Sequence, residues 1–197
     1  MTATAAMNGP STDRTRFSRD LDSIREKLLQ MTGIADEMLT DAVEALLSQN
    51  ASLGEVVIGR DDAIDDLDRQ IDQEVLLLLT TEQPVACFSL RFLSATLKVT
   101  TDLERIGDHA VNIALSAQRM AEDGIGYESL MDVRKSLQIA RGMLGDALQA
   151  FTQHDPRLAT AVIERDDEAD ILYREAQREL RAAMQSEDSA PRDRDRP

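Results

Sequence analysis

The sequence has one cysteine, no tryptophan and only 3% aromatic residues. A single cysteine cannot form an intramolecular disulfide and suits a reducing compartment. Cys87 borders an apolar stretch, so we expect it to be buried. Leu, Ile, Val, Ala and Met have to fill the core. Only five prolines, with abundant Ala, Leu, Glu, Arg and Gln, favour an all-α fold.

Long apolar runs and excess basic charge are also missing. The longest purely apolar run, Val75 to Leu79, is far too short to span a bilayer, and residues 1–16 do not resemble a signal peptide. Acidic residues outnumber basic ones by 37 to 22, a net charge of -15. This charge disfavours nucleic acid as a partner, because phosphates are bound by Lys and Arg. We therefore expect a soluble cytoplasmic protein whose partners are cations or basic protein surfaces.

Apolar residues recur at helical spacing over five segments. These segments predict helices over about residues 18–48, 53–79, 88–122, 128–154 and 156–185. The arm at 1–16 and the tail at 186–197 lack this periodicity, so we expect both to be disordered.

An internal repeat relates the two halves of the chain. VVIGRDDAIDDLDR (56–69) aligns without a gap with AVIERDDEADILYR (161–174), at an offset of 105 residues, and eight positions are identical. Each repeat is predicted to form a three-helix bundle. The counterpart of the third helix would lie beyond residue 197. We therefore expect a three-helix unit at 17–122 and a two-helix unit at 123–185.

The stretch from Lys98 to Ala114 has two faces. An apolar stripe consists of Leu103, Ile106, Ala110 and Ile113. Glu104, Asp108 and Asn112 lie roughly opposite, one helical turn apart. Gly107 is expected at the edge of the apolar stripe, where it would let another helix approach closely.

Carboxylates at i, i+4 occur three times. The pairs are Glu104/Asp108, Asp61/Asp65 and, at the repeat-equivalent positions, Asp166/Asp170. Carboxylate oxygens are ligands for hard cations, which take about six of them. The pattern therefore predicts a di- or trivalent metal ion held by the pair on the third helix and completed by one of the other two pairs.

The same residues are also compatible with an ordinary solvated surface. Arg105 lies three residues from both Asp102 and Asp108, and Arg69 can reach Asp65, Asp66 or Asp72 at three or four residues. Ion pairs at these spacings would neutralise the acidic faces without a metal. No Ser-His-Asp, Cys-His or Gly-rich phosphate-binding arrangement is present in the sequence, so we expect no enzymatic activity.

Several segments together resemble the PhoU family of bacterial regulators of phosphate uptake and signalling. They are TDLERIGDHAVNIA, the preceding EQPV, and VIGRDDAIDDLDRQI with its repeat VIERDDEADILYREA. The likeness covers about residues 20–184 and is most specific at DLERIGDH. It implies tandem three-helix bundles, of which the second here is truncated to two helices.

The resemblance also implies a cytoplasmic regulator without catalytic activity. It implies clusters of iron or a similar metal on E(D)-x-x-x-D motifs, which fall on the three carboxylate pairs. The implied partners are the ATPase of a phosphate ABC transporter and the sensor histidine kinase of a phosphate two-component system. The leading hypothesis is thus an adaptor that represses phosphate uptake and phosphate-starvation signalling.

Two other functions stay open. A helical bundle with a carboxylate-bridged metal could serve another purpose, although di-iron bundles use Glu-x-x-His pairs and neither histidine has a glutamate three residues before it. A histidine phosphotransfer bundle would use His109. A phosphate there would lie among carboxylates, which is electrostatically unfavourable.

The two-helix unit leaves apolar side chains without a third helix. Each large one left in water forfeits roughly 1.5–3 kcal/mol. Examples are Leu137 and Leu144 on one helix and Leu158 and Val162 on the next. Uncovered stripes of this kind usually mark an interface. The unit either packs against helices of another subunit or of a partner, or it stays loosely ordered. Of these outcomes we predict a homodimer in which two such units form a four-helix arrangement.

Overall fold

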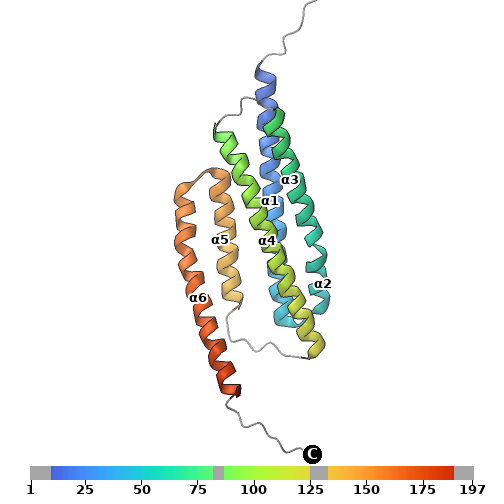
Figure 1. Ribbon diagram of the computed structural model, residues 1–197, viewed down its shortest axis with the longest axis vertical. Coiled ribbons are helices and arrows are strands. Elements are labelled where there is room, and N and C mark those ends of the chain that lie inside the picture. Colours follow the sequence, from blue (N-terminus) through green and yellow to red (C-terminus); the bar gives the residue numbers. More distant parts are fainter. Residues whose placement is uncertain (1–9, 82–86, 125–132, 189–197) are drawn as a thin grey trace, which may run out of the picture. The chain divides into compact units, whose positions relative to one another are not determined.

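The computed structural model describes residues 10–81, 87–124 and 133–188. Within these ranges the chain is helical and has no strand, which confirms the all-α fold class (Figure 1). The helices are α1 (Pro10–Ser48), α2 (Ala51–Gly59), α3 (Asp61–Thr81), α4 (Cys87–Asp123), α5 (Val133–Gln153) and α6 (Pro156–Asp188). The chain divides into unit 1, residues 1–119, and unit 2, residues 120–197. The division falls in the last turns of α4.

The first and the last predicted helices extend beyond their predicted ends. The first helix begins at Pro10, so residues 10–16 are helical and not disordered; proline suits the first helical position because it lacks an N–H that would be unbonded there. The last helix runs to Asp188, three residues beyond the predicted end. Residues 1–9, 128–132 and 189–197, on which other predictions fall, lie outside the described residues.

The helix predicted over 53–79 is broken at Arg60 into α2 and α3. The Arg60 N–H donates to the carbonyl of Val57 (3.1 Å), three residues back and not four. Gly59, directly before the break, is a poor helix former. The Arg60 guanidinium donates to Asp41 on α1 at 2.6 Å, which ties the break to the neighbouring helix.

The core of unit 1 is aliphatic. Its fully buried large side chains come from all three sides of the bundle: Ile24, Leu28, Met31 and Met38 on α1, Val57, Ile64, Ile71 and Val75 on α2 and α3, and Leu93 on α4. Phe92 is buried on α4 beneath the Arg25 guanidinium, and Thr96 and Thr100 on the same helix are also completely buried. Cys87, in contrast to our expectation, is exposed.

From Thr96 onward, the buried face of α4 consists mostly of small residues. Its members there are Thr96, Thr100, Leu103, Gly107, Ala110, Ala114 and Ala117. Gly107 lies within this face and not at its edge, because a Cβ there would stand 2.8 Å from Ile64 Cδ1 on α3. Ile106 and Ile113, predicted as members of the stripe, are half-buried. Small side chains bring α4 close to α3, and the larger isoleucines lie beside the contact.

Unit 2 is an antiparallel α5–α6 hairpin whose turn reproduces the α1–α2 turn of unit 1. Gln49 and His154, 105 residues apart, have positive φ angles of 53° and 56°. The next residues, Asn50 and Asp155, cap the following helices by accepting bonds from backbone N–H groups three residues later, at 3.1 and 3.2 Å. The sequence repeat is therefore also a repeat of local geometry.

An ion pair is repeated in the same way. Arg165 on α6 donates to Asp146 on α5 at 2.5 Å, and these residues are the counterparts of Arg60 and Asp41. Each pair joins the first helix of its unit to the second. The two units thus share their turn and their interhelical pairing.

Candidate functional site

The acidic residues of α3 and α4 meet beside Gly107, where the two helices are in close contact. Asp61 Oδ1 stands 3.6 Å from the position that a Cβ on Gly107 would occupy. Gly107 lies between Glu104 and Asp108 along α4. The structure therefore brings two of the predicted pairs, Asp61/Asp65 and Glu104/Asp108, to one place.

These carboxylates influence one another electrostatically. The pKa of Glu104 is raised first by burial and then by the charges of Asp68, Asp108, Asp65 and Asp61. The pKa of Asp61 is likewise raised by burial and then by Asp65, Asp108 and Asp62. We name Asp61, Asp65, Asp68, Glu104 and Asp108 the acidic cluster.

Asp68 was absent from the predicted ligand set. It lies seven residues after Asp61 on the same face of α3. Its charge raises the pKa of Glu104 more than the charge of any other neighbouring carboxylate does. Its helical spacing was a usable signal. The repeat has Tyr173 in the equivalent position, so the two units share only the pair that corresponds to Asp61 and Asp65.

The arginines expected to neutralise these carboxylates pair elsewhere. Arg69 donates to Asp66 at 2.6 Å, and Arg105 lies 3.6 Å from Asp102. Among the residues that the structure describes, no Lys or Arg forms an ion pair with the acidic cluster. Of the ion pairs considered from the sequence, those with Asp66 and Asp102 form, whereas none is made with Asp65 or Asp108.

The chemistry of the cluster suits a hard cation. Five carboxylates supply oxygen ligands, and their mutual repulsion would be relieved by positive charge. As the side chains stand, no group of three or more His, Cys, Asp or Glu residues in the described ranges forms a ready metal site. The carboxylates would therefore have to turn toward a shared ion.

The third predicted pair lies in unit 2. Asp166 and Asp170 are both exposed on α6, and Asp170 pairs with Arg174 at 2.6 Å. The two pairs on α3 and α4 share unit 1, whereas this pair belongs to a unit with two described helices, α5 and α6.

The repeated helical unit also appears in known proteins. The PhoU domain model matches residues 28–117 and again 133–195, one match in each half of the chain. The chain belongs to the PhoU family. This confirms the resemblance seen in the sequence, and the two matches coincide with the internal repeat.

Individual relatives agree with this assignment. The phosphate-specific transport system accessory protein PhoU homolog of Clostridium acetobutylicum is 34% identical over 174 residues, which cover 88% of this chain and 78% of that protein. PhoU from Pseudomonas aeruginosa has a crystal structure that matches with a TM-score of 0.81 at 34% identity, over 88% of this chain and 83% of that one. The phosphate transport system regulatory protein PhoU from Streptococcus pneumoniae matches with a TM-score of 0.76 at 26% identity, over 86% of this chain and 79% of that one.

Proposed function

We propose that this PhoU-family protein is a non-enzymatic regulator of phosphate uptake, which also represses phosphate-starvation signalling when phosphate is plentiful. The observation that carries the proposal is its similarity, over most of its length, to proteins named as accessory or regulatory components of phosphate transport systems. Its partners would be the ATPase of a phosphate ABC transporter and the sensor histidine kinase of a phosphate two-component system.

The residues support an adaptor in the cytoplasm. The acidic cluster offers ligands and charge but no nucleophile. Among the described residues, no helix is long and apolar enough to cross a membrane. An adaptor of this kind would act through its helical surfaces and would meet the cytoplasmic parts of the transporter and the kinase.

We also propose that the acidic cluster binds a di- or trivalent cation, iron or a similar metal. Glu104 and Asp108 from α4, with Asp61 and Asp65 from α3, would supply the oxygens. The support is the uncompensated charge of these carboxylates and the pKa increases that it causes. Asp166 and Asp170, which the sequence offers as the alternative to Asp61 and Asp65, belong to unit 2.

The regulatory role is tested by deletion. In rich medium, a strain without the protein and without a second copy of it is expected to take up more phosphate and to express phosphate-starvation genes. Plasmid-borne wild-type protein should reverse both effects. Unchanged uptake and unchanged reporter activity in the deletion strain would refute the proposal.

The metal is tested on the purified protein. Glu104→Gln with Asp108→Asn is expected to abolish metal retention in elemental analysis, because each acidic pair alone supplies too few oxygens. Glu164→Gln with Glu168→Gln, an exposed i, i+4 pair on α6, is the matched control and should keep the metal. Retention by the first variant would place the metal elsewhere.

The phosphotransfer alternative gains no support. His109 is exposed on α4 beside Asp108, so a phosphate there would meet the charge of the acidic cluster. Incubation with the kinase and labelled ATP is expected to leave His109 unlabelled.

A further inference from the structure

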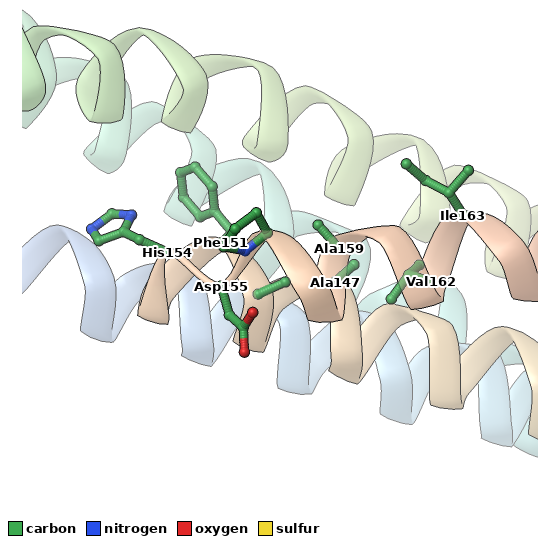
Figure 2. A pocket seen from close by; sticks show the side chains of 9 residues that line it. Ala147, Phe151, His154, Asp155, Ala159, Val162 and Ile163 are labelled. Carbon is green, nitrogen blue, oxygen red and sulfur yellow. The ribbon is translucent and has the colours of Figure 1, made fainter.

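The α5–α6 hairpin carries an apolar groove of about 580 Å³. Its lining includes Ala147, Ala150 and Phe151 from α5 and Ala159, Val162 and Ile163 from α6. Figure 2 shows Ala147, Ala159 and Val162 close to one another between the two helices. All of these residues lie within unit 2.

The internal repeat allows each groove residue to be compared with its counterpart in unit 1. Four pairs have the same residue type: Ala42/Ala147, Ala45/Ala150, Val57/Val162 and Ile58/Ile163. Ala45 and Ala150 are buried in both units, and the other three pairs differ in burial. In unit 1 the alanine and the valine are completely buried and the isoleucine is half-buried. In unit 2 the alanine is exposed, the valine is half-buried and the isoleucine is 72% exposed. This difference in burial shows that an element covers the surface in unit 1, whereas the described residues of unit 2 leave it more exposed.

Helix α4 covers this surface in unit 1. A Cβ on Gly54 would stand 3.2 Å from the carbonyl oxygen of Ala114 and 3.2 Å from Gln118 Cγ. Gln118 Nε2 also donates to the carbonyl of Ala51 at 3.5 Å. Gly54 corresponds to Ala159, in the lining of the groove. The groove therefore has the position, relative to its own two helices, that α4 fills in unit 1.

The buried face of α4, which covers this surface at Ala114 and Gln118, carries a stripe of small residues. Gly107, Ala110, Ala114 and Ala117 follow i, i+3, i+7 and i+10 and are all buried. The groove has Ala159 where unit 1 has glycine. A helix that enters it meets an additional methyl group, so it also needs Gly or Ala at the closest point.

The charge of the α6 surface indicates which polar residues the bound helix should carry. Asp166 and Asp170 continue the α6 surface beyond the groove and are the counterparts of Asp61 and Asp65, which meet Glu104 and Asp108 in unit 1. A helix with lysine or arginine in those two positions would complement the exposed aspartates. A second copy of this chain, with its net charge of -15, would bring more acidic groups to this acidic surface.

We propose that the α5–α6 groove binds an amphipathic helix of another protein, with small residues at i, i+3 and i+7 and basic residues that face Asp166 and Asp170. This mode of binding places one helix in the groove of a helical pair. The occupant differs from the second copy that the sequence led us to expect. The interaction is independent of the proposed role in phosphate regulation.

The probe is a peptide of residues 98–122 of this chain, made with Glu104→Lys and Asp108→Lys. It carries the small-residue stripe of α4 and places lysines opposite the aspartates of α6. Titrated into the full-length, methyl-labelled protein, it is expected to shift the NMR signals of Val162 and Ile163. The unaltered peptide should bind about tenfold more weakly, because its carboxylates would face Asp166 and Asp170.

A pair of matched variants locates the binding. Ile163→Glu places a charge in the groove and is expected to weaken peptide binding at least about tenfold, because burial of an unpaired charge is unfavourable. Ile171→Glu is the control. Ile171 is 51% exposed on the same helix, and its counterpart Asp66 is exposed in unit 1. Ile163 and Ile171 are both exposed, so both variants should fold.

Three results would overturn the proposal. One is the absence of any signal shift at about 1 mM lysine peptide. Another is an equal effect of the two glutamate variants on binding. The third is a dimer in sedimentation that Ile163→Glu dissociates and Ile171→Glu does not, because a second copy would then be the occupant of the groove.

Discussion

Glu104 and Asp61 are the residues through which the acidic cluster affects stability. Both have raised pKa values, and in each case burial is the larger cause and neighbouring carboxylates add to it. A raised pKa means that the folded state holds these protons to a higher pH than the unfolded chain does. The metal-free fold therefore loses stability from these groups as pH rises through that range, and a bound cation would restore it.

Replacement of Glu104 by glutamine tests this linkage. In the metal-free protein, Glu104→Gln is expected to raise the free energy of unfolding by a few tenths of a kcal/mol at about pH 7, because like charges one helical turn apart repel. The gain should fade toward about pH 4, where the carboxylate of the wild type is protonated. Urea denaturation across this range, with a chelator present, measures it.

Asp102→Asn is the control for that experiment. Asp102 is exposed on α4, one turn from Arg105 and outside the acidic cluster. Its replacement removes an attraction and should not stabilise the protein. A Glu104→Gln variant that is less stable than the wild type at neutral pH, with no change on acidification, would contradict this interpretation of the cluster.

At the scale of helices, Gly107 sets the contact between α3 and α4. A Cβ at this position would meet Ile64 Cδ1 at 2.8 Å, and Ile64 is completely buried. The close contact also holds Asp61 beside Glu104 and Asp108. The absence of a side chain at Gly107 therefore determines how close the two carboxylate pairs lie to each other.

Two alanine substitutions separate packing from helix propensity. Gly33→Ala on α1 meets no atom within 4 Å and is expected to stabilise the protein by up to about 1 kcal/mol. Gly107→Ala has the same gain in propensity but overpacks the core, at a cost of about 1–3 kcal/mol, so it should be neutral or destabilising. Denaturant unfolding of both variants measures the difference, and equal stabilisation would mean that α3 and α4 are not in close contact.

At the scale of the whole molecule, the two units differ in how much core they have. Most of the buried apolar residues lie on α1 to α4, whereas α5 contributes Leu148 and Ala150, and none of the described side chains of α6 is buried. Fewer buried contacts imply easier local opening. Unit 2 is therefore expected to be the less stable part of the chain.

Hydrogen exchange tests this difference. The amides of α5 and α6 are expected to exchange at least about tenfold faster than those of α1 and α3, and to slow when the lysine peptide of residues 98–122 is bound. Peptide with its sequence scrambled is the control and should change nothing. Equal protection of both units in the free monomer would show that α5 and α6 are already covered.

Much of this fold could be predicted from the sequence because it depends on local spacing. Helical periodicity, the offset of 105 residues and the three i, i+4 carboxylate pairs follow from the geometry of a single helix. The break at Arg60 was missed because it depends on Gly59 together with an ion pair to Asp41 on another helix. The sequence predicted Gly107 at the edge of the apolar stripe and not within it, because its burial depends on how closely Ile64 of α3 packs against α4.

The sequence by itself determined that the protein is helical, repeated and acidic, and its motifs indicated the PhoU family. Only the tertiary structure decided that Asp61 and Asp65 meet Glu104 and Asp108 in unit 1, while Asp166 and Asp170 lie exposed on α6. It also decided that equivalent residues are buried in one unit and exposed in the other. The physical reason is that periodicity assigns a residue to a face of its own helix, but the residues that it meets depend on how closely the next helix packs against that face.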